Sequence, residues 1–393
     1  MDASTQPIAM LHDVRFNNPF EDGDLFYDLS IELMDFNLFN LKQEAEQYAE
    51  RMAKKARALP NIHDRLTYIL THKRYRKGSK KFFPKEETVN QLDAARRSNT
   101  SFNMTLSFFP VKVTSKLKTF AQFGSEIDSG EVASVLRFYE IARAINIACD
   151  VDACWRITLD GIKYSSVFGY DPKHAVKYSE NLNQLIRFFG IEPYLDLIEE
   201  SNFYPKNFLE LADEKEAEFS ALYYKEPNGT LAEKVNKLIP NTCLSLYEAS
   251  RYSAYDLSLI HSPRVSETEL PSHLKGVRRH FINEATRRSI RYFALYRVVY
   301  ETGLYSSHFA DCLKCTIHPK PNQVGLYAAN RSTALFPHHG QGFLKEGKEL
   351  SLDNIRIGLA GDIRRNSSNV GYSLNSDVYP FLDSKHPFII RLT

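Results

Sequence analysis

The chain has 393 residues, of which 43% are hydrophobic and 25% are charged, which is the composition of a globular protein with a large core. Its 50 basic and 48 acidic residues nearly cancel to a formal charge of +2, which excludes a protein that holds nucleic acid by neutralising its phosphates. The first residues lack an export signal and no apolar run could cross a bilayer, so we expect a cytoplasmic protein without a membrane partner.

The first hundred residues are expected to form an irregular arm and peripheral helices. Residues 1–24 are polar, whereas residues 25–59 carry a helical stripe of apolar side chains. Residues 72–81 are densely basic, and we interpret them as a solvated loop, with a basic lip over an anionic substrate as the alternative. A short helix is predicted over residues 87–97.

An apolar strand over residues 104–109 runs directly into a cluster of lysines. Pro110 ends the strand, and Lys112, Lys116 and Lys118 follow within one short polar segment. In open α/β sheets, ligands bind at this carboxyl edge of the strands. The fold is therefore expected to be organised around this segment, with the lysines facing an anion; the alternative is a solvated loop after a core strand.

Two further predicted strands also end in an ionisable residue. Residues 154–159 are followed by Asp160, and residues 313–317 are followed by His318. Long helical patterns separate the three strands, so we expect them to be parallel neighbours in one sheet. Lys112, Asp160 and His318 would then meet in one cleft as a cation, a carboxylate and a group that titrates near neutrality.

Helices are expected between these strands, over residues 131–146, 173–189 and 273–300, with another strand over residues 193–198. Residues 203–270 are predicted to be a helical insertion in which the sequence indicates no chemistry. Together the elements predict an α/β fold with a mostly parallel, Rossmann-like sheet flanked by helices.

The C-terminal part is expected to add β structure to this core. A short strand is predicted over residues 323–328 and a β-hairpin over residues 343–352, around Glu346 and Gly347. Only weak strand signals follow. The expected divisions are residues 1–100 for the N-terminal arm and peripheral helices, 101–352 for the catalytic core and 353–393 for a C-terminal extension.

One arginine of the long predicted helix stands out. Arg288 lies beside the buried stripe, and a buried guanidinium is costly unless it is paired, so we predict that it binds a phosphate or carboxylate. Arg287 and Arg291 fall away from the stripe and are interpreted as surface charges. Tyr292 either donates a hydrogen bond or only packs, and packing is favoured.

Cys312 and Cys315 form a C-x-x-C pair near two histidines, which raises the question of a metal site. A structural zinc site needs a second ligand pair at matching spacing, and the sequence contains no other C-x-x-C. Buried thiols are therefore favoured, and no metal is predicted. The odd number of cysteines, five, fits a reducing compartment.

Five short segments occur in a fixed order between residues 104 and 352. They are Phe109-Pro-Val-Lys112 with Lys118, Leu159-Asp-Gly-Ile-Lys-Tyr-Ser165 with Phe168-Gly169, Arg287-Arg-Ser-Ile-Arg-Tyr292, Thr316-Ile-His-Pro-Lys-Pro321 with Gly325, and Phe336-Pro-His-His-Gly340. This ordered set resembles the motifs of the pyoverdine/dityrosine biosynthesis family, the isocyanide (isonitrile) synthases. The chain departs from that pattern at five positions: Ser115, Ile162, Ser166, Gln323 and His338.

The resemblance implies an enzyme of secondary metabolism that takes an aromatic L-amino acid, tyrosine or tryptophan, and ribulose 5-phosphate. The amino group becomes an isocyanide whose carbon comes from the sugar phosphate. The family implies no redox cofactor, and it suggests a downstream oxygenase of the same pathway as a partner. The alternatives are a divergent member that binds a sugar phosphate or amino acid without forming isocyanide, and an unrelated α/β enzyme that uses another sugar phosphate.

The matched segments contain residues suited to this chemistry. Anchoring the phosphate is a role that Lys112, Lys118 and Arg288 share. The two lysines supply compact positive charges, and the guanidinium of the arginine supplies paired hydrogen-bond donors. Proton transfers fall first to His318 and then to Asp160. The remaining expected site residues are His339, which assists or orients the substrate carboxylate, and Ser289 and Tyr292 of the matched helix, which are counted with the substrate-binding residues.

Overall fold

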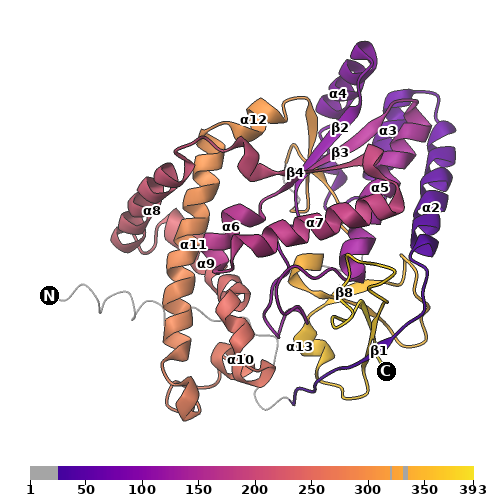
Figure 1. The fold of residues 1–393 in the computed structure, drawn as a ribbon. Helices are drawn as coiled ribbons and strands as arrows, with labels where there is room; N and C mark the ends of the chain where they lie inside the picture. Colours follow the sequence, from indigo (N-terminus) through magenta and orange to yellow (C-terminus); the bar gives the residue numbers. More distant parts are fainter. Residues whose placement is uncertain (1–24, 319–320, 331–334) are drawn as a thin grey trace.

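The structure is a computed structural model that describes residues 25–318, 321–330 and 335–393 (Figure 1). Across these residues the strands form two five-stranded sheets. One sheet is built from the middle of the chain, and the other joins segments from its two ends.

The central sheet has the strand order β4-β3-β2-β5-β6, and each neighbouring pair is parallel. Its strands are β2 (Phe102–Ser107), β3 (Ala153–Leu159), β4 (Leu195–Glu199), β5 (Cys312–Thr316) and β6 (Val324–Gly325). Met104 of β2 lies between Trp155 of β3 and Leu313 of β5, and all three side chains are fully buried. The predicted α/β fold, with the three strands as parallel neighbours, is therefore confirmed.

Helices flank this sheet and fill its crossovers. They are α2 (Phe39–Arg57), α3 (Ile62–Thr71), α4 (Lys85–Ser98), α5 (Ser129–Cys149), α6 (Gly161–Phe168), α7 (Pro172–Phe189) and α12 (Leu304–His308). Helix α5 is buried along almost its whole length, because it packs between the sheet and α2. Helix α7 ends at Gly190, which adopts the left-handed conformation that glycine tolerates best.

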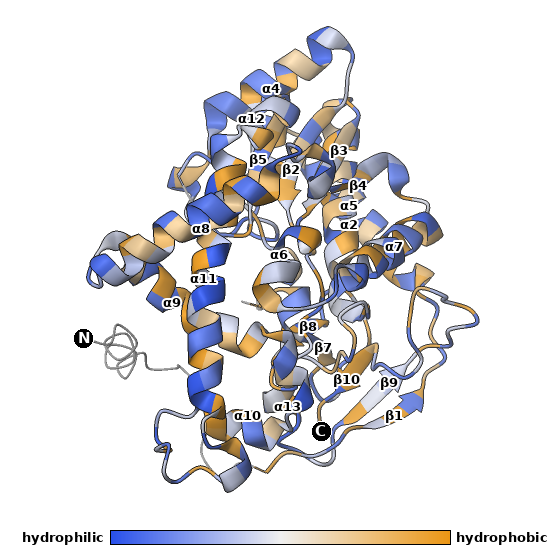
Figure 2. Ribbon diagram, turned by 60° about the vertical axis from the view of Figure 1, so that its left-hand side comes forward, coloured by the Kyte–Doolittle hydropathy of each residue, from blue (hydrophilic) through white to orange (hydrophobic). Residues whose placement is uncertain are grey.

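The predicted helical insertion is present and packs against the long helix. Its helices are α8 (Phe208–Lys225), α9 (Thr230–Ser245) and α10 (Ala254–His261), and the long helix is α11 (Val277–Glu301). Hydrophobic and hydrophilic stretches alternate along α11, whose neighbours include α8 and α9 (Figure 2). Leu117, from the loop that follows β2, is buried in the same apolar cluster as α9 and α11. None of the described helices is both long and apolar enough to cross a membrane.

The second sheet is mixed and has the order β1-β9-β10-β7-β8. Its strands are β1 (Ser30–Leu33), β7 (Gln341–Leu344), β8 (Arg356–Gly358), β9 (Val370–Ser373) and β10 (Ile389–Arg391), with the short helix α13 (Ala360–Ile363) after β8. The expected C-terminal hairpin is the antiparallel pair of β7 and β8. Its second strand comes after residue 352, however, so the connection is longer than the pattern around Glu346 and Gly347 predicts.

Two expectations for the N-terminal part are wrong. Residues 30–33 form strand β1 rather than helix, because they pair with β9 about 340 positions later, which local periodicity does not register. The basic run at residues 72–81 is not simply a solvated loop. Arg74 pairs with Glu140 and Asp353 at 2.6 Å each, because the fully buried Glu140 carboxylate requires a cation. The expected arm over residues 1–24 lies outside the described residues.

Candidate active site

The carboxyl ends of β2, β3 and β5 lie side by side, but the three residues beyond them turn to different surroundings. Lys112 is 1% exposed, and its ammonium contacts Asp128 at 2.7 Å and both oxygens of Glu131 at 2.9 and 3.0 Å. These carboxylates cap the start of α5. Burial alone would lower the pKa of Lys112, but the two carboxylates raise it above its ordinary value. Lys112 is therefore a charged member of a buried ion triad.

Lys118 has surroundings of the opposite kind. It is 4% exposed, and its ammonium donates to Asn241 Oδ1 at 2.6 Å and to Ser245 Oγ at 2.7 Å, both on α9. Among the residues described, no carboxylate lies within ion-pair distance of it. Burial without a counter-charge lowers the pKa of Lys118 to about 7. The sequence indicates no chemistry in residues 203–270, yet this insertion supplies both partners of the lysine.

The pKa of Lys118 predicts a pH effect on stability. Since an unfolded lysine titrates near pH ~10.4, the unfolded chain binds more protons than the folded chain between about pH 7 and 10, and stability rises with pH there. We expect the free energy of unfolding of the wild type to increase over this range relative to Lys118→Met, by at most about 1.4 kcal/mol per pH unit. Urea unfolding at several pH values measures it, and a flat difference would contradict an uncompensated ammonium.

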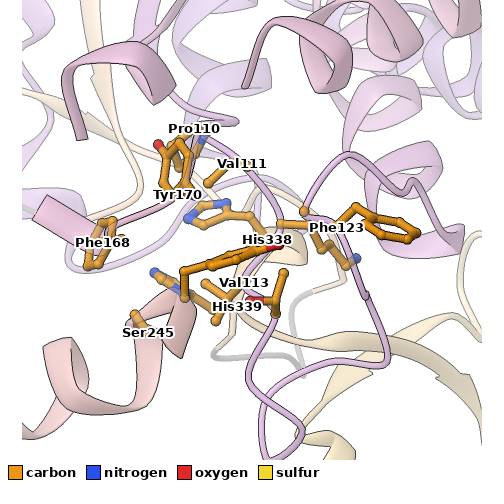
Figure 3. A pocket seen from close by; sticks show the side chains of 13 residues that line it. Pro110, Val111, Val113, Phe123, Phe168, Tyr170, Ser245, His338 and His339 are labelled. Atoms are coloured by element: carbon orange, nitrogen blue, oxygen red, sulfur yellow. The ribbon is translucent and has the colours of Figure 1, made fainter. Parts of the chain in front are cut away.

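A narrow pocket lies between the loop after β2 and the end of α9. Its cavity volume is only about 20 Å³, and the empty space with the open mouth included is about 370 Å³. Its lining residues are Pro110, Val111, Lys112, Val113, Thr114, Phe123, Gly124, Phe168, Tyr170, Ser245, Tyr247, His338 and His339. Figure 3 shows His338 and His339 side by side between Phe123 and Phe168. Ser245 connects this pocket to Lys118, because its hydroxyl both lines the pocket and accepts from the ammonium.

The two histidines of the pocket are held neutral. Their ring centroids are 4.4 Å apart, and the Nδ1 atom of each is buried without a hydrogen-bond partner among the described residues. Burial lowers the pKa of His338 to about 3 and lowers the pKa of His339 well below its usual value. Lys118 lies close enough to contribute to both shifts. Two neutral imidazoles thus line the pocket, and the ammonium of Lys118 lies behind Ser245 of the same lining.

His318 lies next to this pair rather than in the pocket lining. Its ring packs edge-on against Phe336 at 5.3 Å, and Phe336 stacks on His338 at 5.7 Å. His318 is exposed to solvent, whereas His338 is 6% exposed. The structure therefore brings His318, His338 and His339 together, with His318 on the outer side.

Asp160 belongs to a neighbouring buried network. Its carboxylate accepts from Ser107 Oγ at 2.9 Å and lies 3.8 Å from Lys163, which also contacts Glu200 at 2.6 Å. Burial raises the pKa of Asp160 to about 6. Gly161 directly follows Asp160 in the chain, and its carbonyl oxygen accepts a hydrogen bond from the hydroxyl of Tyr170, which lines the pocket. The network therefore lies directly behind one wall of the pocket.

The expected residues of α11 all have partners within the protein. Arg288 donates to Glu284 at 3.0 Å and to the Ser166 carbonyl at 3.2 Å. Its guanidinium packs against Gly169, where a Cβ atom would lie 2.9 Å from Nη1. Ser289 is fully buried and contacts Thr242 Oγ1 of α9 at 3.0 Å.

The other two side chains of this stretch of α11 lie in packing positions. Tyr292 stacks on Tyr164, with ring centroids 5.0 Å apart. The interpretation of Arg291 as a surface charge is wrong. It is 8% exposed and pairs with Asp213 and Glu216, because α8 covers that face of the helix.

Cys312 and Cys315 are buried free thiols, as expected. Burial raises the pKa of both, that of Cys312 to about 12, so neither thiol is activated as a nucleophile. Within the described ranges no cluster of three or more histidine, cysteine or acidic residues is arranged to hold a metal ion.

Sequence reasoning misses Asn241, Ser245 and Tyr247, which come from the helical insertion. A usable signal is the spacing of Asn241 and Ser245, one helical turn apart, which places two polar side chains on one face of α9. Lys163 and Glu200 are also missed. Lys163 lies three residues after Asp160, a spacing that brings side chains together at the start of a helix, whereas Glu200 pairs with Lys163 from a distant segment that the sequence does not connect to it.

Comparisons with known proteins give one family and a shared fold. The model of the family described as "Pyoverdine/dityrosine biosynthesis protein" matches residues 92–324. The crystal structure of the PvcA protein from Pseudomonas aeruginosa is similar with a TM-score of 0.54 and 14% sequence identity, covering 85% of this chain and 100% of that chain. At this identity the likeness shows the fold alone. A search of curated proteins found no match.

Proposed function

The chain belongs to the pyoverdine/dityrosine biosynthesis family, and we propose on that premise that it is an isocyanide synthase-like enzyme. It converts the amino group of an aromatic L-amino acid, tyrosine or tryptophan, to an isocyanide, with ribulose 5-phosphate as the carbon donor.

The observation that carries this proposal is the ammonium of Lys118. A buried cation is costly unless an anion compensates it, and its protein partners, Asn241 and Ser245, are both neutral. A phosphate group supplies the missing charge, and charge-assisted hydrogen bonds to phosphate are stronger than those between neutral groups. Lys118 is therefore the proposed phosphate anchor, at the sheet edge where ligands bind in open α/β folds.

The walls of the pocket beside Lys118 suit an aromatic ring, and the pocket must widen to admit one. Phe123, Phe168, Tyr170 and Tyr247 supply aromatic surface to its walls. Such walls bury a flat ring favourably, and a few polar groups then fix its orientation. The tyrosine or tryptophan side chain is assigned to the aromatic walls, and its amino group is assigned to the part of the lining that His338 and His339 form.

Proton transfers in this scheme fall to the histidines and Asp160. Condensation of the amine with the ketose carbonyl forms an imine and releases water, so protons must leave nitrogen and reach the departing oxygen. A general base works best when its pKa lies near the working pH, so the buried His338 and His339, whose pKa values burial lowers, are weak bases at neutral pH. His318 remains the proposed main proton-transfer group, with His339 beside it and Asp160, whose pKa is raised to about 6 by burial, as the second.

The direct test incubates the purified protein with tyrosine or tryptophan and uniformly ¹³C-labelled ribulose 5-phosphate. Mass spectrometry should find an isocyanide product one mass unit heavier than the product formed from unlabelled sugar phosphate. Absence of isocyanide with every aromatic amino acid would retire the catalytic proposal.

A second candidate is a member that binds a sugar phosphate or amino acid without forming isocyanide. Its support is that Lys112 and Arg288, two of the three expected phosphate ligands, already pair with protein carboxylates. Thermal-shift titration with ribulose 5-phosphate separates the two candidates, because a binder is stabilised without turnover.

Replacing His318 with alanine should reduce isocyanide formation by about 10²–10⁴-fold while leaving sugar-phosphate binding in place. The matched control is His308→Ala, since His308 is also exposed and its ring also packs on a phenylalanine, Phe203. Turnover is measured by mass spectrometry and binding by thermal shift. Equal turnover in the two variants would remove His318 from the mechanism.

A further inference from the structure

The ammonium of Lys118 has one N–H donor beyond the two that residues within the described ranges accept. A lysine ammonium carries three donors, and Asn241 and Ser245 accept two of them. The Ser245 hydroxyl donates its own proton to the carbonyl of Asn241 at 2.8 Å, so it faces the lysine as an acceptor. The contacts fix the direction of the ammonium without neutralising it.

The backbone of Lys118 is anchored from three parts of the fold. Its amide donates to the Ser115 carbonyl at 2.8 Å, and its own carbonyl accepts from the Ala360 amide at 3.1 Å. The preceding residue, Leu117, is fully buried in the apolar cluster of the helical insertion. Such anchoring fixes the backbone of Lys118, and the hydrogen bonds to Asn241 and Ser245 set the direction of its side chain before any ligand arrives.

A second polar group on the same loop is also left over. The hydroxyl of Ser115 is buried without a hydrogen-bond partner among the residues described. Buried polar groups are normally satisfied, and an exception calls for a ligand or a functional reason. Ser115 and Lys118 belong to one backbone turn. The same loop therefore carries a cation with only neutral partners and a hydroxyl with no hydrogen-bond partner among the described residues.

We propose that Asn241 and Ser245 of α9 are positioning residues, which hold the Lys118 ammonium as an uncompensated cation so that its third donor meets the phosphate of the ligand. This inference rests on the proposed function for the identity of the phosphate ester. The helical insertion thereby has a role in binding, because α9 supplies neutral acceptors. A carboxylate in their place would neutralise the lysine and compete with the phosphate.

The test replaces the neutral acceptor with a charged one of the same shape. Asn241→Asp puts a carboxylate next to Lys118, and binding of ribulose 5-phosphate should weaken by on the order of ten-fold or more. Asn241→Ala leaves the cation uncompensated but less well held, and it should weaken binding by a smaller factor. Asn236→Asp is the matched control, since it adds the same charge to the same helix and should change the affinity by less than about two-fold.

The order of the two variants at Asn241 distinguishes positioning from a purely structural role. A structural role predicts that the isosteric aspartate is tolerated and that alanine does the greater harm. Titration calorimetry measures both affinities, with inorganic phosphate and ribulose 5-phosphate as separate probes to distinguish a free anion site from a sugar-phosphate site. If Asn241→Asp fails to fold, Asn241→Ala still reports through its affinity, and a value equal to the wild type overturns the inference.

An independent readout is the titration of Lys118 itself. Carbon NMR of ¹³C-lysine-labelled protein should show its midpoint moving up in Asn241→Asp, because a carboxylate stabilises the charged form. An unmoved midpoint, or phosphate binding that survives the aspartate, overturns the inference. Phosphate binding that obeys the expected order in a protein that forms no isocyanide supports the inference and removes the proposed reaction.

Discussion

Lys118→Met is expected to weaken the binding of ribulose 5-phosphate and to lower kcat/KM for isocyanide formation, each by at least about 30-fold. Removing a buried charged partner of an anion costs about 2–5 kcal/mol of binding, which corresponds to factors of about 30 to several thousand. Calorimetry and the mass-spectrometric assay measure the two quantities. Wild-type affinity in this variant would exclude Lys118 as the phosphate anchor.

The same variant should unfold at a higher temperature than the wild type. Methionine keeps most of the apolar stem and removes a buried ammonium whose partners among the described residues are both neutral, so the folded state gains stability. Lost binding together with gained stability separates a functional lysine from a structural one. Lys116→Met, two positions earlier on the same loop, is the matched control and should leave the affinity almost unchanged.

Lys112→Met should have the opposite effect on stability, lowering the free energy of unfolding by about 3–5 kcal/mol. The substitution leaves the carboxylates of Asp128 and Glu131 buried and adjacent, with the cation between them removed. These carboxylates also cap α5, so the damage reaches the start of the most buried helix. Urea unfolding measures the change.

Two further variants make this prediction specific. Lys42→Met breaks a surface pair with Glu46 and should cost less than about 1 kcal/mol. Combining Lys112→Met with Asp128→Asn and Glu131→Gln should recover part of the lost stability, because no unpaired charge remains. A Lys112→Met protein as stable as the wild type would show that the triad does not support the fold.

The central sheet could be predicted because its strands are buried on both faces. Continuous apolar runs around Met104, Trp155 and Leu313 mark such strands, and the long helical patterns between them require parallel crossovers. The end of the helix predicted over residues 173–189 is also correct, because Gly190 follows it and glycine tolerates the left-handed conformation that ends α7. These features depend on neighbours in the sequence.

The site was harder to predict because its contacts join distant segments. The sequence brings Lys112 and Lys118 to the same loop, but it does not show that one turns to carboxylates and the other to neutral acceptors. Asn241 lies 123 positions from Lys118, and only the packing of α9 beside the loop brings them together. Arg291 was misassigned for the same reason, since its partners lie on α8.

The pairing of β1 with β9 has a consequence for how the protein is made. Ser30 lies opposite Val370, and Leu33 lies opposite Ser373, so β1 has no partner until about 340 more residues have left the ribosome. At ordinary translation rates this delay is on the order of tens of seconds. During that interval the exposed side chains of Ile31 and Leu33 are within reach of chaperones and of other nascent chains.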